Sequence, residues 1–208
     1  MSTSVTRRAQ VRQSREEVRS RIVAAASELL RTRSFAELTV DDVMRAAGQG
    51  RTVFYRHFDD LADLLRRSSR EALDELYAAQ EQLTREDPPM PPGGALRGLR
   101  PAVAVYERHG PLLRGVTEAA ASDPELAAAL AALRGRFEDL AVIVLQAAAE
   151  RSSAPLADPR QTARALNLMN ESYLLDAFGR EPRVDPDVAA RTLAEIWMAA
   201  VTPTGGTA

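Results

Sequence analysis

The 208-residue chain contains no cysteine and no lysine, holds only two histidines, and draws just 5% of its residues from the aromatic types. Without cysteine it can form no disulfide, no thiolate metal site and no cysteine nucleophile. Neither His57 nor His109 belongs to a metal-ligand spacing such as H-E-x-x-H, and the chain has no glycine-rich phosphate loop and no G-x-S-x-G motif. We therefore expect no catalytic residue, no metal, no cofactor and no enzymatic activity.

Long apolar stretches are also absent. No run approaches the roughly 20 residues of a membrane span, and the polar start, MSTSVTRRAQVRQSR, lacks the apolar region of a secretory signal. With 45% hydrophobic and 27% charged residues, the composition is nevertheless ordinary for a globular protein. The expected location is the cytoplasm, with no membrane partner.

Positive charge is unevenly distributed along the chain. Residues 1–70 hold 14 arginines and 9 acidic residues, a net charge of +5, whereas residues 71–208 hold 13 arginines and 20 acidic residues, a net charge of −7. The two parts add up to the formal −2 of the whole chain. A basic first third before an acidic remainder indicates that only the N-terminal part meets a polyanion.

Helical patterning runs along most of the chain, without a strand pattern of useful length. Capping signatures at 14–17 and 39–42 predict the starts of two helices, and aspartates 59 and 60 cap another. Asp-Pro pairs predict further helix starts at 124, 159 and 186.

Proline and glycine predict the breaks between helices. The segment 85–94, REDPPMPPGG, reads as a loop, and His109-Gly110-Pro111 is expected to separate a helix at 95–108 from one at 111–121. The fold class that we expect is all-α, with about nine helices.

Residues 39–58, TVDDVMRAAGQGRTVFYRHF, have the layout of a helix-turn-helix, whose second helix lies in the DNA major groove. That second helix is expected at about 51–57. Arg51 can pair with O6 and N7 of guanine. Early positions on the same helix can reach base edges: Gln49, Thr52 and Val53. Other residues suit phosphates, which position a protein without reading sequence: Thr39, Tyr55, Arg56 and His57.

Some of these residues have a second interpretation. Phe58 is assigned to the domain core. For Tyr55 we expect a buried ring whose hydroxyl faces a phosphate, which reconciles a core role with a contact role. Residues 1–13 are either a solvated tail or a basic arm that reaches DNA, and both interpretations stay open.

A second polar group lies on one face of a later helix. Asn167, Asn170 and Glu171 are spaced i, i+3 and i+4 in an otherwise apolar segment. Polar groups on a largely buried helix need partners, and an apolar ligand cavity with a few polar anchors supplies them. Alternatively they bond to one another or to neighbouring backbone, or lie in a dimer seam. Candidate cavity walls are Phe137, Leu174, Leu175 and Trp197.

Residues 18–65 resemble the DNA-binding domain of TetR-type transcriptional regulators. The resemblance is carried by TVDDV at 39–43, AG at 47–48 and VFYRHF at 53–58, which fall at the family spacing. It implies an N-terminal helix-turn-helix domain, a larger helical ligand-sensing domain and a homodimer. The expected division is a flexible basic arm (1–13), a three-helix helix-turn-helix domain (14–60), a helical ligand-binding and dimerisation domain (61–202) and a tail (203–208).

Residues 165–171, ALNLMNE, together with Trp197, are similar to the ligand domain of one branch of this family. The similarity implies that the two asparagines and the tryptophan border a long apolar tunnel. In that branch the tunnel is richer in aromatic residues, and Phe137 and Leu175 stand where bulkier rings are found. Ligand preferences are therefore not carried over.

The DNA-binding segment departs from the family pattern at three positions. Gln49 replaces an apolar turn residue, Gly50 replaces a serine that caps the recognition helix, and Leu61 replaces a lysine that contacts phosphate. A glycine cap costs roughly a few tenths of a kcal/mol relative to serine. Gly50 is counted with the DNA-binding segment.

The sequence thus predicts a homodimeric transcriptional regulator that binds double-stranded, palindromic operator DNA. We expect a repressor that a small apolar ligand releases from its operator, with dimer faces on the helices at about 159–178 and 186–201. The alternative is a helical small-molecule binding protein whose DNA binding is weakened or lost. The Gln49-Gly50 turn and the missing lysine favour that alternative.

Overall fold

The computed structural model describes residues 2–85, 93–153 and 156–201 of the chain. Regular structure within these ranges is helical throughout, with eight α-helices, one short 3-10 helix and no strand. The all-α prediction is therefore confirmed. Most of the predicted loop at 85–94 and the whole tail at 203–208 lie outside the described residues.

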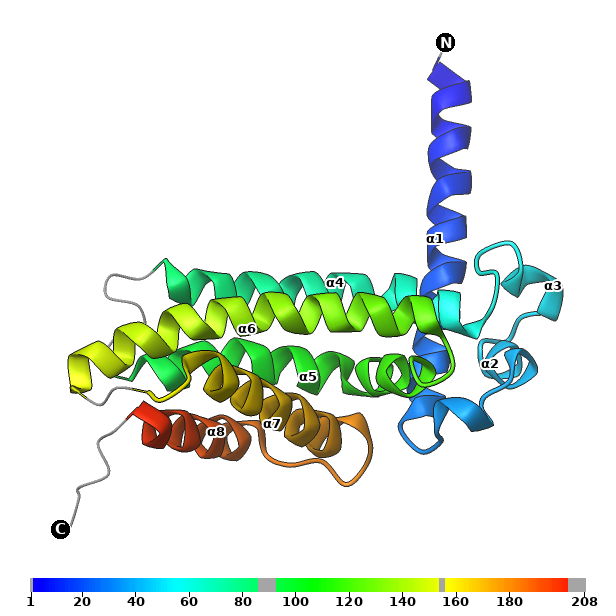
Figure 1. The fold of residues 1–208 in the computed structure, drawn as a ribbon. Coiled ribbons are helices and arrows are strands. Elements are labelled where there is room, and N and C mark those ends of the chain that lie inside the picture. Colours follow the sequence, from blue (N-terminus) through cyan, green and yellow to red (C-terminus); the bar gives the residue numbers. More distant parts are fainter. Residues whose placement is uncertain (1, 86–92, 154–155, 202–208) are drawn as a thin grey trace.

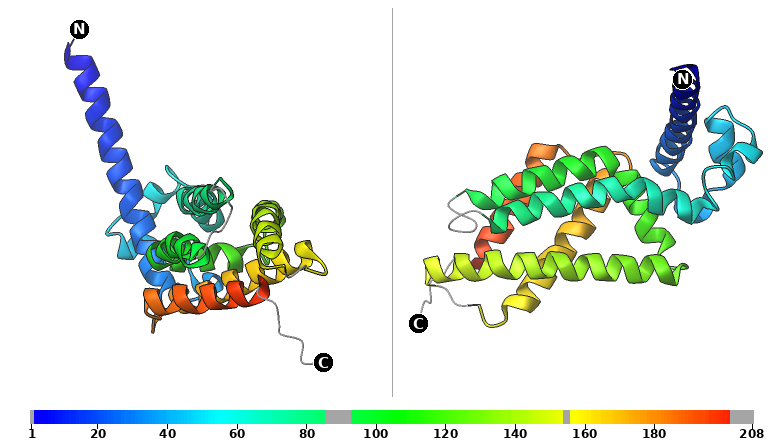
Figure 2. Two further views of the ribbon diagram at one scale, coloured as in Figure 1. Left: turned by 90° about the vertical axis from the view of Figure 1, so that its left-hand side faces the viewer. Right: turned by 90° about the horizontal axis from the view of Figure 1, so that it is seen from above.

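The N-terminal elements gather at one end of the molecule, and the longer helices that follow form the rest (Figure 1). The N-terminal elements are α1 (Ser2–Leu30), η1 (Phe35–Glu37), α2 (Val40–Ala46) and α3 (Arg51–Phe54). The longer helices are α4 (Leu61–Thr84), α5 (Gly94–Ala119), α6 (Pro124–Ser152), α7 (Pro159–Gly179) and α8 (Pro186–Val201). In the left view of Figure 2 the N-terminal end of α1 extends beyond the other helices.

Polar caps set the starts of five helices, as the sequence predicts. In each case a side-chain oxygen accepts a backbone N–H of the first turn, an arrangement that stabilises a helix by about 1 kcal/mol. The capping residues are Thr39, Asp60, Asp123, Asp158 and Asp185.

α1 begins at Ser2 and not at the predicted capping box of residues 14–17. Residues 2–13 contain neither proline nor glycine. Nothing in their backbone therefore stops the helix from continuing toward the N-terminus once its packed part, from Ile22 onward, has formed. The predicted helix start at Ser14 was wrong, and the backbone of the expected flexible arm is helical from Ser2 on.

α5 runs without interruption through His109-Gly110-Pro111, where a break was predicted. Pro111 removes one backbone N–H, but this stretch is buried and packs against the end of α7. A Cβ added to Gly110 would lie 2.4 Å from Phe178 O, so the absence of a side chain permits the close approach. Tertiary packing outweighs the local break signal, and the two predicted helices are one.

The two largest of three clusters of buried side chains join most of the helices. One joins α1, α2 and α3 to α4, to the C-terminal part of α5 and to the start of α6; it includes Ile22, Met44, Phe54, Phe58, Leu65 and Val116. The other fills the space between α5, α6, α7 and α8; it includes Leu145, Leu174, Phe178 and Leu193. Of the N-terminal elements, α1 and η1 therefore pack directly against α5. None of the described helices combines the length and apolar character of a membrane span.

Candidate functional site

Residues 39–58 form two short helices joined by a tight turn. Gly48 has a φ of +64°, in the left-handed region that glycine adopts without strain. The N–H of Gln49 then returns to the carbonyl of Met44 at 2.9 Å. Gly50 occupies the N-cap of α3 without a side-chain hydrogen bond, because it has no side chain to supply one.

α3 covers only Arg51–Phe54, whereas the prediction extended it to His57. The N–H groups of His57 and Phe58 both return to the carbonyl of Phe54, at 2.8 and 2.9 Å, and this turns the chain. Phe58 can then pack beside Phe54, with ring centroids 5.5 Å apart. Phe58 is buried, which confirms its assignment to the core.

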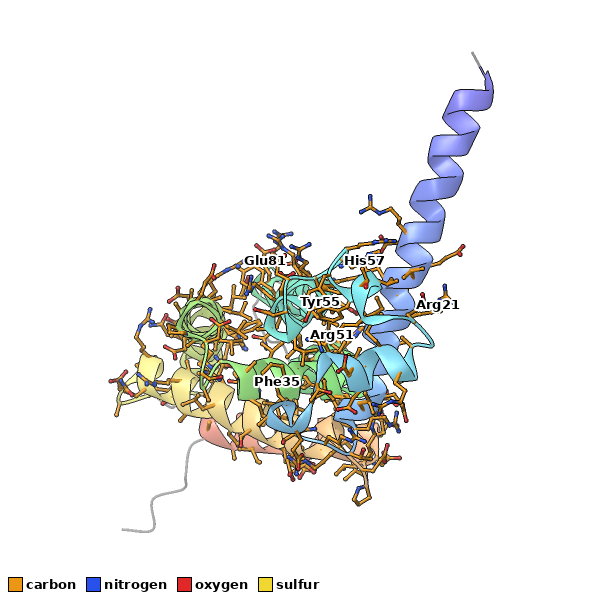
Figure 3. All side chains as sticks on the ribbon, turned by 90° about the vertical axis from the view of Figure 1, so that its right-hand side faces the viewer. Arg21, Phe35, Arg51, Tyr55, His57 and Glu81 are labelled. Atoms are coloured by element: carbon orange, nitrogen blue, oxygen red, sulfur yellow. The ribbon has the colours of Figure 1, made fainter. Side chains whose placement is uncertain are left out.

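The predicted DNA-contacting residues lie at the end of the molecule that Figure 3 views, where Arg51, Tyr55 and His57 are labelled. Six are exposed: Thr39, Gly50, Arg51, Thr52, Tyr55 and Arg56. Three are partly buried: Gln49, Val53 and His57. Tyr55 is 49% exposed, so the predicted burial of its ring was wrong. The core space is filled by Phe54, against whose ring Tyr55 lies edge to face.

Arg51 is held by two neighbours. Its guanidinium lies 3.2 Å from the Asp41 carboxylate and 3.2 Å from the Tyr55 hydroxyl, and it stands over the Tyr55 ring. The hydrogen bond to Tyr55 and the charge of Asp41 raise the pKa of Arg51. All three side chains are exposed, so the pairing is weak and the guanidinium can exchange it for a guanine edge.

His57 lies between the recognition segment and α1. Burial, followed by the charges of Arg15 and Arg19, lowers the pKa of His57 below its usual value of 6.5. The imidazole is therefore neutral at pH 7 in the free protein. A phosphate placed against it would oppose the arginine charges and favour the protonated form.

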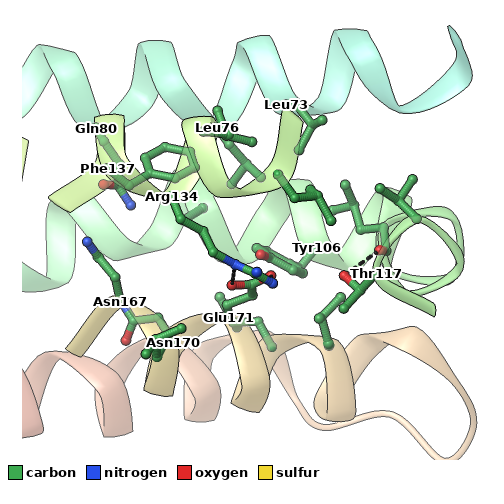
Figure 4. A pocket seen from close by; sticks show the side chains of 18 of the residues that line it. Leu73, Leu76, Gln80, Tyr106, Thr117, Arg134, Phe137, Asn167, Asn170 and Glu171 are labelled. Carbon is green, nitrogen blue, oxygen red and sulfur yellow. Dashed lines mark hydrogen bonds and ion pairs between the residues drawn. The ribbon is translucent and has the colours of Figure 1, made fainter. Parts of the chain in front are cut away.

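A pocket of about 810 Å³, open solvent at its mouth included, lies between α4, α5, α6 and α7 (Figure 4). The structure brings six of the predicted ligand-binding residues together on its wall: Phe137, Asn167, Asn170, Glu171, Leu174 and Leu175. Most of the remaining lining is apolar, for example Leu73, Leu76, Leu113 and Leu133. An apolar lining with a few polar groups is typical of small-molecule sites.

The two asparagines differ in their hydrogen bonding. Asn170 is only 7% exposed, and its Oδ1 accepts the indole N–H of Trp197 at 3.1 Å. The amide nitrogen of Asn167 is buried and has no hydrogen-bond partner within the described part of the chain. Trp197 itself borders a second, smaller cavity, which shares Gln80 with the first. The tryptophan thus orients Asn170 and lies outside the pocket wall.

Glu171 is already paired. Both of its carboxylate oxygens accept hydrogen bonds from Arg134, from Nε and Nη2, each at 2.7 Å. The pair crosses the middle of the pocket in Figure 4, beside Tyr106. Burial, reinforced by Glu171, raises the pKa of Tyr106, so its hydroxyl stays neutral. Sequence reasoning missed Arg134 and Tyr106, because no spacing within α5 or α6 indicates which residue will face α7.

A buried arginine joins the two ends of the molecule. Arg114 on α5 is 6% exposed and donates to the carbonyls of Leu30, Arg33 and Gly179. It also pairs with Glu118, whose carboxylate accepts the N–H of Phe35 at 2.6 Å. The end of α1, η1 and the end of α7 therefore meet at one side chain. The sequence carried no signal for it.

Comparison with known proteins identifies both parts of the chain. Residues 22–67 match the family model "Bacterial regulatory proteins, tetR family", and residues 96–202 match "Transcriptional regulator EthR, C-terminal domain". The protein EthR of Mycolicibacterium smegmatis is 30% identical over 193 residues, which cover 92% of this chain and 89% of that one. EthR of Mycobacterium tuberculosis is 27% identical over 183 residues, covering 86% and 85%.

Solved structures agree in fold. The TetR family regulator PfmR from Thermus thermophilus superposes with a TM-score of 0.72 at 21% identity, covering 88% of this chain and 99% of its own. A tetR family regulatory protein from Rhodococcus gives a TM-score of 0.67 at 22% identity, covering 89% and 97%. These relatives are transcriptional regulators and not enzymes. The chain belongs to the TetR family of DNA-binding transcriptional regulators, with a C-terminal domain of the EthR type.

Proposed function

We propose that this protein is a ligand-responsive repressor. It binds a palindromic operator as a homodimer in the cytoplasm, and a small, largely apolar ligand in the pocket between α4 and α7 releases it. The observation that carries this proposal is the buried Arg114. It links the end of α7, a helix whose residues 167–175 include pocket-lining side chains, to the end of α1 in the DNA-binding part.

The pocket supports a neutral ligand that carries one hydrogen-bond acceptor. Its walls are mostly apolar, and Arg134 and Glu171 on them neutralise each other. The carboxylate of Glu138, which also lines the pocket, lies 3.9 Å from Arg160. The buried amide N–H₂ of Asn167 lacks an acceptor within the described residues. A ligand carbonyl at this position would satisfy the donor and gain affinity from it.

The recognition segment supports direct readout of DNA. Arg51 and Thr52 lie exposed at the start of α3, beside Gly50, where no side chain blocks the approach of a base pair. In a dimer the two copies of α3 would lie about 34 Å apart, one turn of DNA, or a multiple of that distance. This geometry requires a palindromic operator.

The outer faces of α7 and α8 support a dimer. Leu168, Val188 and Ile196 are large apolar side chains exposed on these two helices. A four-helix bundle made by two copies would bury them and offset the ordering cost with apolar contact. Ile196 is 40% exposed on α8, and Ile143 is 46% exposed on α6, outside the proposed interface.

This pair of isoleucines tests the dimer. Light scattering after size exclusion should give twice the chain mass for the parent protein and for Ile143→Glu. Ile196→Glu should give the monomer mass at micromolar concentration, because a carboxylate would be buried against its own copy. A monomeric parent protein would contradict the proposed assembly.

Release by ligand follows from differential affinity. A ligand that fits the pocket only when α7 is displaced would move Gly179 against Arg114 and change the position of α1. Any other conformational change that separates the two α3 helices would lower operator affinity in the same way. The ligand cannot shift the equilibrium by more than its preference for the displaced state.

Selection of bound duplexes from a random DNA pool tests the function. The full-length protein should enrich a palindrome with two half-sites, and neutral N-alkyl amides that raise the melting temperature should lower its affinity for that palindrome. Recovery of no enriched sequence, together with stabilisation by the same amides, would instead favour a small-molecule binding protein without DNA function.

A further inference from the structure

Three side chains meet at the start of α3, and one of them has no role so far. Arg51 and Tyr55 are the candidate DNA contacts of this group (Figure 3). The third side chain, Asp41, lies in the first turn of α2. Both of its carboxylate oxygens accept hydrogen bonds from Nη1 of Arg51, at 3.3 and 3.2 Å. The pair therefore ties the first turn of α2 to the first residue of α3.

The two neighbouring aspartates of α2 serve different purposes. Asp42 accepts the hydroxyl hydrogen of Thr39, the cap of α2, at 2.6 Å and lies 3.3 Å from Arg45. Asp41 takes no part in the cap, and within the described residues its side chain pairs with Arg51 alone. Holding Arg51 is therefore what this carboxylate does in the structure.

The three arginines of residues 39–57 are held to different degrees. Arg45 pairs with Asp42 inside α2. Arg56 forms no ion pair with any residue that the structure describes. Of these three, Arg51 is the one that is bound across two helices. A free guanidinium can follow any phosphate, whereas a held guanidinium presents a fixed edge.

The contacts of Arg51 leave enough donors for a base. A guanidinium carries five N–H groups. Asp41 bonds to Nη1, and the Tyr55 hydroxyl accepts from Nη2 at 3.2 Å. Nε and Nη2 therefore keep at least one N–H each for O6 and N7 of guanine. Arg134 uses the same two nitrogens to bind both oxygens of Glu171.

Bound DNA would strengthen the pair between Arg51 and Asp41. In the free protein the two side chains are 60% and 56% exposed, so water screens their attraction. A duplex seated on α3 would exclude much of this water, and a lower local dielectric strengthens the attraction. A carboxylate without its arginine would also face the phosphates unpaired. Keeping the pair is therefore favoured over exchanging it.

We propose that Asp41 is a specificity-determining residue, which holds the guanidinium of Arg51 in the orientation that reads guanine and away from the phosphates. It is a positioning residue and touches no base itself. This inference rests on the base-reading role of Arg51 in the proposed function and adds the residue that makes this reader selective. Without Asp41 the guanidinium would turn to a phosphate on any duplex, which adds affinity without sequence information.

Duplexes with single substitutions test this role. The full-length protein is titrated by fluorescence anisotropy with the selected palindrome and with versions in which one guanine at a time is replaced by adenine. The guanine that Arg51 reads is the one whose replacement no longer lowers affinity in Arg51→Ala. At that guanine the parent protein should discriminate by about 5–150-fold.

Asp41→Asn should lower this discrimination ratio by at least about threefold. The released guanidinium gains phosphate contacts on both duplexes and loses its fixed geometry on guanine. Affinity for the substituted duplex should therefore rise more than affinity for the palindrome. Asparagine is nearly the same size as aspartate, and thermal unfolding checks that the variant is folded.

Asp59→Asn controls for the lost negative charge. Asp59 is exposed, follows residues 39–58 directly and forms no ion pair within the described part of the chain. Its replacement should strengthen binding to both duplexes by the same factor, because repulsion from phosphates carries no sequence information. The discrimination ratio should stay as in the parent protein.

A double-mutant cycle shows whether Asp41 acts through Arg51. In the Arg51→Ala background, Asp41→Asn should change no discrimination ratio at any guanine. If it still lowers a ratio there, Asp41 contacts a base itself and the inference is wrong.

Two further outcomes separate the inference from the proposed function. A ratio that Arg51→Ala lowers and Asp41→Asn leaves unchanged overturns the role of Asp41, and base reading by Arg51 stands. If Arg51→Ala lowers no ratio, base reading by Arg51 fails and the inference fails with it.

Discussion

The end of the molecule that carries the helix-turn-helix and the part that carries the pocket are built in opposite ways. At the first, every candidate contact residue lies within residues 39–57, and most of these side chains are exposed. At the second, the pocket takes its lining from four helices that span residues 73–175, and two of its polar groups, Asn170 and Glu171, are paired with side chains on other helices. A short local segment can be replaced residue by residue, whereas a shared interior couples each change to its neighbours.

Arg114 is where the two ends meet, so its replacement is expected to have the largest effect. Arg114→Leu removes the partner of three backbone carbonyls and of the Glu118 carboxylate, and should lower the free energy of unfolding by about 3–5 kcal/mol. Denaturant unfolding followed by circular dichroism measures this. Arg100→Leu on the same helix breaks an exposed pair with Asp187 and should cost less than about 1 kcal/mol.

Arg51 tests whether the DNA-binding end works as a local unit. Arg51→Ala should weaken binding to the selected palindrome by about 1–3 kcal/mol, because a guanine contact is lost. Stability should change by less than about 0.5 kcal/mol, since the pairs with Asp41 and Tyr55 are exposed. Fluorescence anisotropy with the palindrome and with an unrelated duplex separates the two effects. Equal weakening on both duplexes would contradict a base-reading role.

The two asparagines of the pocket should respond in opposite directions. Asn170→Ala leaves the indole N–H of Trp197 without its acceptor and should destabilise the protein by about 1–3 kcal/mol. Asn167→Leu removes a buried amide that has no described partner, and should leave stability unchanged or raise it by up to about 1 kcal/mol. Thermal unfolding without ligand measures both. A destabilised Asn167→Leu would show that an acceptor for this amide exists in the free protein.

His57 gives the smallest expected effect and concerns pH. Its folded pKa is lowered, so the unfolded state takes up the proton more readily. The contribution of His57 to stability is therefore present above pH 6.5 and is lost as pH falls through the lowered pKa. Contact with a phosphate favours the protonated form of His57. Operator affinity should therefore rise as pH falls over the same range, at constant salt. His57→Gln should abolish that rise, and His109→Gln should not.

Much of the architecture could be read from local chemistry. Aspartate, serine or threonine before a helix start is recognisable because the cap bonds a backbone N–H within three residues. The Gly48 turn is equally local, since its left-handed φ follows from the missing Cβ. The predicted break at Gly110 was wrong because a distant contact decides there: α7 packs against this stretch of α5. The ring of Tyr55 is exposed because Phe54 and Phe58 fill the core.

The ligand end separates the two kinds of information most sharply. The spacing of Asn167, Asn170 and Glu171 was sufficient to place them on one helix face, because a helix repeats every 3.6 residues. The spacing did not show which of the three side chains has a hydrogen-bond partner. Trp197 donates to Asn170, Arg134 donates to Glu171, and the amide nitrogen of Asn167 has no partner among the described residues. These partners come from other helices.

The sequence by itself therefore determined the helix-turn-helix, five of the helix starts and the apolar faces, since these depend on neighbours within a few residues. The tertiary structure alone decided the pocket and the Arg114 junction. Each of these needs side chains that are tens of residues apart in the chain, and no local pattern records which of them will meet.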